Sequence, residues 1–269
     1  MEAVISVKDL NLSYGENNRS VMALQNINLD IHEGDFLCVL GPSGCGKSTF
    51  LKIIAGFLFP TSGKAMLDGK EIKKPDYSRG VVFQTPNLYP WMNIEKNVCY
   101  GPKMRGIPKN TIKELSDKYL AQVGLSDFKK QKTYELSGGM KQRAALAKVL
   151  INDPRIILMD EPFGALDALT RVNMQGLIRN IWKETGKTIM LITHDVDEAL
   201  QLGNRVIVFS KRPGTILEEF NVDFSNRITG KGEENDIIFS KEYMEVKQKI
   251  LEIINRQHDE IAEKALRVE

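Results

Sequence analysis

The segment Gly41-Pro-Ser-Gly-Cys-Gly-Lys-Ser-Thr49 constrains the fold of this chain more than any other feature. It fits the pattern G-x-x-x-x-G-K-[ST], and it lies between the apolar run Phe36–Leu40 and the amphipathic stretch Thr49–Ala55. Glycines let a backbone curl so that successive N–H groups point at one anion, and a helix N-terminus adds free N–H groups and a positive dipole end. The pattern therefore predicts a strand, a phosphate-binding loop and a helix. Lys47 would contact the β- and γ-phosphates of a nucleotide, and the hydroxyl of Ser48 would bind Mg²⁺. The predicted nucleotide contacts in this segment are Gly41, Pro42, Ser43, Gly44, Cys45, Gly46, Lys47, Ser48 and Thr49.

Composition limits the class of protein. The chain has 269 residues, 42% hydrophobic and 27% charged, which suits one large soluble domain or a domain with a subdomain. Its formal net charge of +2 gives no electrostatic argument for nucleic acid as a partner. No apolar run is long enough to cross a bilayer, and the first residues do not resemble a signal peptide. We therefore expect a cytoplasmic protein.

The cysteines Cys38, Cys45 and Cys99 are odd in number and lack metal-ligand spacing, so three reduced thiols in a reducing compartment are expected. Because Cys45 lies inside the predicted phosphate loop, its backbone matters more than its sulfur, although its thiol could make the site sensitive to alkylating or oxidising reagents.

Hydrophobic periodicity predicts strands that alternate with helices, and hence an α/β fold with a mainly parallel sheet. Near the N-terminus the strand-like runs follow one another without helices, with a tight turn at Asp68-Gly69. The predicted strands are Ile5–Leu12, Ala23–Ile31, Phe36–Leu40, Gly63–Leu67, Gly80–Phe83, Ile156–Met159, Thr188–Ile192 and Arg205–Phe209, with an edge hairpin at Thr215–Val222. The predicted helices of the core are Gly138–Ile151, Ala168–Glu184 and Asp195–Leu202.

The middle of the chain has helical signals from about Ile94 to Gln131, and Asn93 is a plausible N-cap. Prolines at 90, 102 and 108 are predicted to separate these helical pieces. We predict a nucleotide-binding domain at residues 1–235, with a helical subdomain inserted at about 90–150, and a helical extension at 236–269. Within the last part, Asn226–Glu234 reads as a loop and Ser240–Ile261 as an amphipathic helix.

A second site signal is the run Ile156-Ile-Leu-Met-Asp160-Glu161. Its apolar residues are typical of a central parallel strand that is covered on both faces. Ligands bind beyond the carboxyl ends of such strands, where this one would present two acids. Asp160 could hold Mg²⁺ through water, and Glu161 could accept a proton from water that attacks the γ-phosphate.

A third signal is Leu136-Ser-Gly-Gly-Met-Lys-Gln-Arg143, in which Ser137 can cap the following helix and Gly138 and Gly139 leave its N-terminus bare. Such an end binds anions, although physical reasoning alone leaves an ordinary glycine-containing loop equally open.

These residues resemble the signature motif of the ATP-binding-cassette (ABC) ATPases, with Met140 where most members have Gln. Gln84 resembles the glutamine that senses Mg²⁺ and the γ-phosphate, Ala165-Leu-Asp167 the D-loop, and His194 the switch histidine. Tyr14 resembles the aromatic residue that stacks on adenine. The resemblance covers roughly Ile5 to Pro213. It implies a P-loop NTPase core with an N-terminal antiparallel β subdomain and an inserted helical subdomain.

The resemblance also implies roles. Glu161, His194, Lys47 and Gln84 would be catalytic, ATP and Mg²⁺ would be bound, and Ser48, Gln84 and Asp160 would hold the metal. Outside the family context, His194 could be a satisfied imidazole, Gln84 a routine loop residue and Tyr14 part of strand packing.

Relatives with these motifs act as head-to-tail homodimers, in which ATP on the loop of one copy also meets Ser137, Gly138 and Gly139 of the other. Asp160–Arg171, Thr193–Ala199 and Arg212-Pro-Gly214 resemble the ATPases of nitrate, sulfonate and taurine importers. The resemblance thus implies a subunit on the cytoplasmic face of the membrane, under two integral-membrane permease subunits and indirectly served by a solute-binding protein.

The segment around Trp91 and Met92 has two readings: a buried contact at a helix entry, or the lip of a groove that receives a helix from a membrane subunit. For the whole chain, the rivals are a soluble cassette ATPase of DNA repair or translation, a nucleotide kinase, and a regulator that binds ATP without cleaving it. A kinase would not need Leu136–Arg143 or His194 in this order, and the presence of both Glu161 and His194 argues against the regulator. The C-terminal helix carries no motif, so packing or a dimer contact is its expected role.

Overall fold

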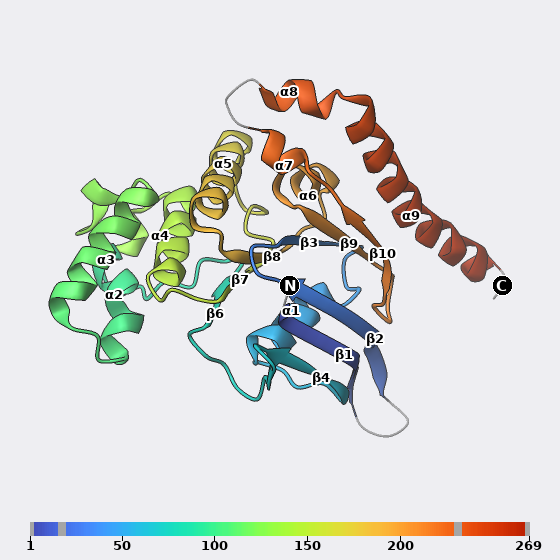
Figure 1. Ribbon diagram of the computed structural model, residues 1–269, viewed down its shortest axis with the longest axis horizontal. Helices are drawn as coiled ribbons and strands as arrows, with labels where there is room; N and C mark the ends of the chain where they lie inside the picture. The colour runs from blue at the N-terminus through green and yellow to red at the C-terminus, as the bar shows by residue number, and fades with distance from the viewer. Residues whose placement is uncertain (1–2, 16–19, 229–232, 267–269) are drawn as a thin grey trace. The chain divides into compact units, whose positions relative to one another are not determined.

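The computed structural model describes residues 3–15, 20–228 and 233–266 (Figure 1). In the last of these ranges, side chains are described only for residues 236–257. The chain divides into two compact units. Met1–Lys74 and Met190–Glu269 form the first unit, and Pro75–Ile189 form the second.

The first unit contains an antiparallel sheet in the order β2-β1-β4-β5 (Figure 1). Its strands are β1 (Ala3–Tyr14), β2 (Val21–His32), β4 (Ser62–Leu67) and β5 (Lys70–Glu71). The turn between β4 and β5 has φ of 46° at Asp68 and 73° at Gly69, as the sequence predicts for an Asp-Gly hairpin. The N-terminal antiparallel β subdomain is therefore confirmed.

The same unit holds the strand that leads to the predicted phosphate loop. β3 (Phe36–Leu40) is buried along its whole length and pairs in parallel with β9 (Arg205–Phe209), while β10 (Ile216–Asn221) pairs with β9 antiparallel. The edge hairpin predicted at Thr215–Val222 is a single edge strand, which forms its hairpin with β9. After the loop, α1 (Lys47–Ala55) buries its apolar face and ends at Gly56, which has φ of 81°.

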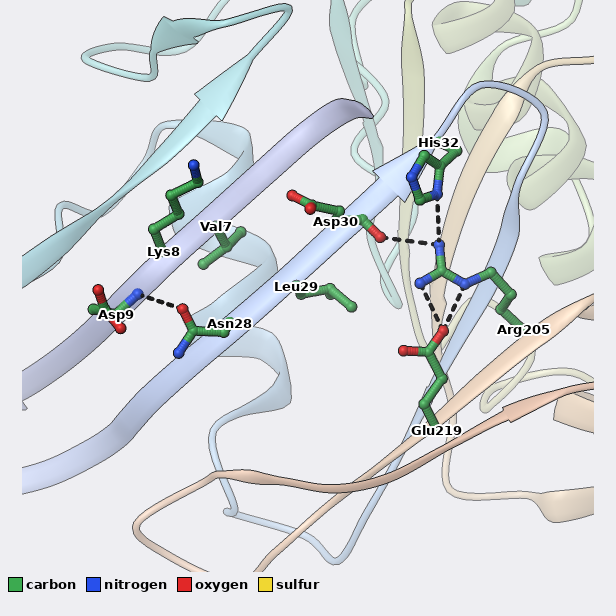
Figure 2. Close-up of a pocket in the computed structure, with 9 residues that line it drawn as sticks. All are labelled: Val7, Lys8, Asp9, Asn28, Leu29, Asp30, His32, Arg205 and Glu219. Atoms are coloured by element: carbon green, nitrogen blue, oxygen red, sulfur yellow. Dashed lines mark hydrogen bonds and ion pairs between the residues drawn. The ribbon is translucent and has the colours of Figure 1, made fainter. Parts of the chain in front are cut away.

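Arg205, the first residue of β9, ties the two sheets of this unit together (Figure 2). Its Nε donates to Oε1 of Glu219 at 2.7 Å, and its Nη1 donates to the carbonyl oxygen of Asp30 at 2.9 Å. It also forms an ion pair with Asp35, and both of these side chains are largely buried. Because a buried charge needs a partner, this cluster fixes how β2 lies against the β9–β10 hairpin.

The C-terminal part of the first unit is helical: α6 (Val196–Leu202), α7 (Phe224–Arg227), α8 (Glu233–Ile238) and α9 (Lys241–Leu266). Tyr243 and Ile250 of α9 are fully buried, so the predicted amphipathic helix is confirmed. The loop predicted at Asn226–Glu234 is partly wrong, because α7 and α8 occupy both of its ends; residues 229–232 lie outside the described residues. The polar composition of this segment does not show why α7 forms. Phe224 packs with its ring centroid 5.0 Å from that of Tyr243.

In the second unit, β6 (Arg79–Val82) pairs in parallel with β7 (Ile156–Asp160). Its helices are α2 (Ile94–Met104), α3 (Lys109–Gln122), α4 (Gly138–Leu150) and α5 (Ala168–Thr185), with short 3₁₀ turns at Ser126–Phe128 and Thr133–Glu135. β8 (Thr188–Ile192) crosses the boundary between the units, and the residue after it, Thr193, donates its N–H to the carbonyl oxygen of Val39 at 3.2 Å.

In the second unit, the sequence predicted the starts of α2 and α3 correctly but placed Pro102 wrongly. Asn93 caps α2, its side-chain oxygen accepting from the N–H of Lys96 at 2.8 Å, and Pro108 immediately precedes α3. Pro102 was predicted to separate helical pieces, but it lies inside α2. Its missing N–H removes a single helical hydrogen bond near the end of α2, and the buried position of its ring offsets that loss. The domain bounds given above stay a prediction.

Candidate nucleotide site

The glycines of the loop between β3 and α1 have backbone shapes that other residues rarely adopt. Gly44 and Gly46 have φ of 75° and 110°. A Cβ on Gly46 would lie 2.9 Å from the carbonyl oxygen of Ala23, whereas one on Gly44 would meet nothing within 4 Å. Gly46 is therefore required by close packing on β2. Gly44 is on the open side of the loop, where an anion can approach its backbone.

Lys47 places a positive charge inside this loop. Its side chain is only 5% exposed, and Nζ donates to the carbonyl oxygens of Gly41 at 2.7 Å and Pro42 at 2.9 Å. Two backbone carbonyl oxygens thus accept hydrogen bonds from this buried ammonium, as a buried polar group requires. The loop thus combines a buried cation with a helix N-terminus at Lys47, and both attract anions.

The cysteine of the loop corrects one expectation. Cys45 is 1% exposed, and burial raises the pKa of its thiol above the ordinary value, although the nearby Lys47 ammonium lowers it somewhat. The thiolate is the reactive form, so both exposure and ionisation act against modification. The expected sensitivity of Cys45 to alkylating or oxidising reagents is therefore not supported. Cys38, Cys45 and Cys99 are all free thiols.

A cavity of about 760 Å³ opens beside the loop, and it is lined by Gly41–Gly44, His194, Lys211, Arg212 and Ile254. The first unit therefore brings His194 to the loop, as the family resemblance implies. Among the described side chains, neither Lys211 nor Arg212 has a carboxylate partner, so the cavity carries two further cations.

Sequence reasoning did not identify Lys211, Arg212 and Ile254 as residues that line this cavity. The available signal was Arg212-Pro-Gly214, which marked only a branch of the family. The structure gives a physical reason for the glycine in this motif. Gly214 donates its N–H to the carbonyl oxygen of Ala23 at 2.9 Å, and a Cβ on Gly214 would lie 2.3 Å from the carbonyl oxygen of Cys45. Only glycine lets this segment lie against the phosphate loop.

Tyr14 lies at the end of β1, and its side chain is 44% exposed. Its hydroxyl lies 3.2 Å from Oγ1 of Thr49, in α1. The ring is thus exposed next to the helix that follows the loop, and stacking on adenine stays a prediction.

In the second unit, Gln84 and Glu161 lie close to the same glycine. A Cβ on Gly164 would be 3.2 Å from Nε2 of Gln84 and 4.0 Å from Oε2 of Glu161. Asp160 ends β7, and Glu161 follows it with φ of 44°, an uncommon conformation for a residue other than glycine. Strained backbone of this kind is concentrated at functional sites.

The signature segment begins α4. Oγ of Ser137 accepts from the N–H of Met140 at 3.3 Å, and Ser137 and Gly138 are exposed. A Cβ on Gly139 would lie 2.4 Å from Cγ2 of Thr170, whereas one on Gly138 would meet nothing within 4 Å. The second glycine is therefore needed for packing of α4 against α5, and the first is left on an accessible helix end.

Trp91 is 68% exposed, with its ring centroid 5.5 Å from that of Tyr89, and its carbonyl oxygen accepts from Nζ of Lys132 at 3.2 Å. The alternative of a buried contact at the helix entry is therefore wrong for Trp91.

The predicted metal ligands are a hydroxyl, an amide and a carboxylate on Ser48, Gln84 and Asp160. Such hard oxygen donors suit Mg²⁺, which needs few protein ligands because it keeps waters and binds phosphates. Within the described part of the chain, no cluster of three or more His, Cys, Asp or Glu residues could hold a metal ion. None of the described helices is long and apolar enough to cross a membrane.

Comparison with known proteins agrees with this chemistry. The family model "ABC transporter" matches residues 24–164. The taurine import ATP-binding protein TauB of Roseobacter denitrificans is 50% identical over 252 residues, covering 93% of this chain and 92% of that protein. An uncharacterized ABC transporter ATP-binding protein of Methanocaldococcus jannaschii is 47% identical over 254 residues, which cover 94% and 92% of the two chains.

The solved structures that match this chain are also ATP-binding cassettes. A dimeric ATP-binding cassette in a post-hydrolysis state, bound to ADP and Pi, matches with a TM-score of 0.72 and 32% identity, covering 81% of this chain and 98% of that one. The cbiO1 protein of Clostridium perfringens, part of the ABC transporter complex cbiONQ, matches with a TM-score of 0.75 and 27% identity, covering 93% and 100%.

The fold and the phosphate loop define an ATP-binding cassette with a P-loop ATPase core. The chain belongs to the ABC transporter family.

Proposed function

We propose that this chain is the ATP-hydrolysing subunit of an importer for taurine or a related small solute. The observation that carries the proposal is the 50% identity to a taurine import ATP-binding protein over 93% of this chain. The open phosphate loop with its buried ammonium supports ATP as the energy source.

In the proposed mechanism, the loop amides and Lys47 bind the β- and γ-phosphates. On ATP binding, the Lys47 ammonium moves from the carbonyl oxygens of Gly41 and Pro42 to phosphate oxygens. Ser48, Gln84 and Asp160 would hold Mg²⁺, which neutralises phosphate charge when it is bound. Glu161 accepts the proton of the attacking water, and His194 orients the terminal phosphate.

Two copies are proposed to form a head-to-tail homodimer, with Ser137, Gly138 and Gly139 of one copy closing over the nucleotide of the other. The exposed, capped start of α4 supports this placement because it leaves free N–H groups for an anion. ATP then closes the pair, and hydrolysis opens it.

The proposed partners are two membrane permease subunits and, indirectly, a solute-binding protein, with the cassette on the cytoplasmic face. Trp91 supports a docking site for a permease helix, because a large exposed aromatic ring is a frequent anchor at interfaces. Trp91→Glu should lower uptake by a reconstituted transporter at least about tenfold and leave ATP binding unchanged. Normal uptake by this variant would remove Trp91 from the docking site.

The decisive test compares Lys47→Ala with Lys52→Ala, a control that removes an exposed lysine of the same helix. In cells that lack their own taurine uptake, the wild-type chain and its permease should import labelled taurine. Lys47→Ala should abolish uptake and weaken ATP binding, while Lys52→Ala should behave as wild type. ATP binding by Lys47→Ala at full affinity would refute the loop assignment. ATP hydrolysis without uptake of any small sulfonate would refute the proposal that taurine or a related solute is the cargo.

A further inference from the structure

The C-terminal helix α9 forms part of the wall of the cavity beside the phosphate loop. Ile254 of α9 lines the cavity directly, together with Gly41–Gly44 and His194. Oε1 of Gln257 accepts from the backbone N–H of Lys211 at 2.6 Å, and Lys211 also lines the cavity. The helix is therefore part of the surroundings of the nucleotide site.

The second contact of α9 is with α6, the helix that follows His194. The hydroxyl of Tyr243 donates to Oδ1 of Asp197 at 2.8 Å, and Nζ of Lys247 donates to Oδ2 of the same carboxylate at 2.8 Å. Tyr243 is completely buried, and the three groups form a partly enclosed network. We call Tyr243, Lys247 and Asp197 the α9 clamp.

The backbone between the clamp and His194 has little freedom. Oδ1 of Asp195 accepts from the N–H groups of Asp197 at 2.8 Å and Glu198 at 3.2 Å. The N–H of Asp195 donates to Oγ1 of Thr193 at 3.0 Å, and that hydroxyl donates to Oε2 of Glu198 at 2.6 Å. His194 is thus held between two hydrogen-bonded neighbours, so a displacement of the first turn of α6 is passed on to it.

We propose that α9 is a positioning element of the ATPase site, which fixes the His194 segment through the clamp and the cationic Lys211–Arg212 segment through Gln257. The inference rests on the proposed function, because it takes the ligand of the cavity to be the terminal phosphate of ATP. Tyr243 and Lys247 are positioning residues, since they act on the phosphate through His194 and do not touch it.

The clamp can be removed with little loss of packing. Tyr243→Phe keeps the ring that packs on Phe224, and Lys247→Met keeps the aliphatic stem. The matched control is Lys249→Met on the same helix, because Lys249 forms an ion pair with Glu218 of β10 and does not contact Asp197.

The first measurement is steady-state hydrolysis by the full-length protein. The double variant Tyr243→Phe/Lys247→Met should lower kcat about fivefold and change KM for ATP less than about twofold, because a misplaced His194 is felt mainly in the transition state. Lys249→Met should keep wild-type values. A wild-type kcat in the double variant, or an equal loss in Lys249→Met, would overturn the proposal.

The second measurement reports on His194 itself. The chain has three histidines, so NMR of imidazole-labelled protein can be assigned by replacing them one at a time. The double variant should shift or broaden the His194 signal and leave that of His32, which lies beside Arg205, unchanged. An unchanged His194 signal would overturn the proposal even if kcat falls. Absence of ATP turnover in the wild type would instead refute the proposed function, and the NMR result would still decide the role of α9.

Discussion

Glu161 combines a strained backbone with a proposed role in catalysis. Its φ of 44° follows directly after the apolar strand β7, and its carboxylate lies near Gly164, which is also close to the amide of Gln84. A conformation of this kind costs about 1–3 kcal/mol and persists only where the surrounding structure enforces it. The strain therefore supports the assignment of Glu161 as the base.

We predict that Glu161→Gln lowers kcat for ATP hydrolysis at least about 100-fold, because the amide cannot accept the proton of the attacking water. ATP affinity should stay within about twofold of wild type, since the loop and Lys47 are untouched. Titration with a fluorescent ATP analogue and a phosphate-release assay measure the two quantities. Glu114→Gln, on the exposed face of α3, is the control for charge removal. Hydrolysis at the wild-type rate in the Glu161 variant would exclude this residue as the base.

The phosphate loop was predictable residue by residue because its chemistry is local: strand, glycines, lysine and helix are adjacent in the chain. Lys211 and Arg212 could not be found in this way. They line the same cavity as Gly41 because of the pairing of β9 with β3, which joins residues far apart in the sequence. Burial of Cys45 was equally hidden, since it depends on segments such as Gly214 that pack over the loop.

Among the elements, strands and capped helices followed the sequence closely, whereas the C-terminal region did not. Asn93 and Ser137 cap α2 and α4 through contacts within one helical turn, and such contacts can be read from a short window. The helix α7 forms because Phe224 packs on Tyr243, a contact that a short window cannot contain. Pro102 is tolerated in α2 for a similar reason, since burial in the tertiary structure overrides local propensity.

The start of α4 offers a matched pair of glycines. We predict that Gly139→Ala lowers the free energy of unfolding by about 1–3 kcal/mol, because the new Cβ would clash with the branched side chain of Thr170. Gly138→Ala should change it by no more than about 0.5 kcal/mol, because that Cβ would meet no atom. Urea denaturation of the two variants measures the difference. Equal stability of both would show that α4 is free to move away from α5.

At the scale of the whole molecule, the sequence predicted the fold class and the family, but it could not identify the cargo. The motifs of a cassette concern the binding of nucleotide phosphates, and none of them is expected to contact the cargo. The taurine proposal therefore rests on the similarity of the whole chain to taurine import ATP-binding proteins. The role of α9 lies outside every motif, and it became visible only from the contacts with Asp197 and Lys211.

In the proposed homodimer, one copy supplies the phosphate loop and the other supplies Ser137, Gly138 and Gly139, so that only the pair completes the site. We predict that Glu161→Gln in saturating ATP and Mg²⁺ sediments as a pair of 30.4-kDa chains, because nucleotide that is not cleaved keeps the copies together. With ADP the same variant should sediment as a single chain.

The control for that experiment adds Ser137→Arg to Glu161→Gln. The large side chain would block the exposed start of α4, while the phosphate loop of the same copy stays intact. The double variant should therefore bind ATP normally and still sediment as one chain. Dimers of unchanged stability in the double variant would mean that the start of α4 does not face the nucleotide of the second copy. A Glu161→Gln protein that remains single in saturating ATP would refute the composite site itself, because each nucleotide would then be bound by one chain alone.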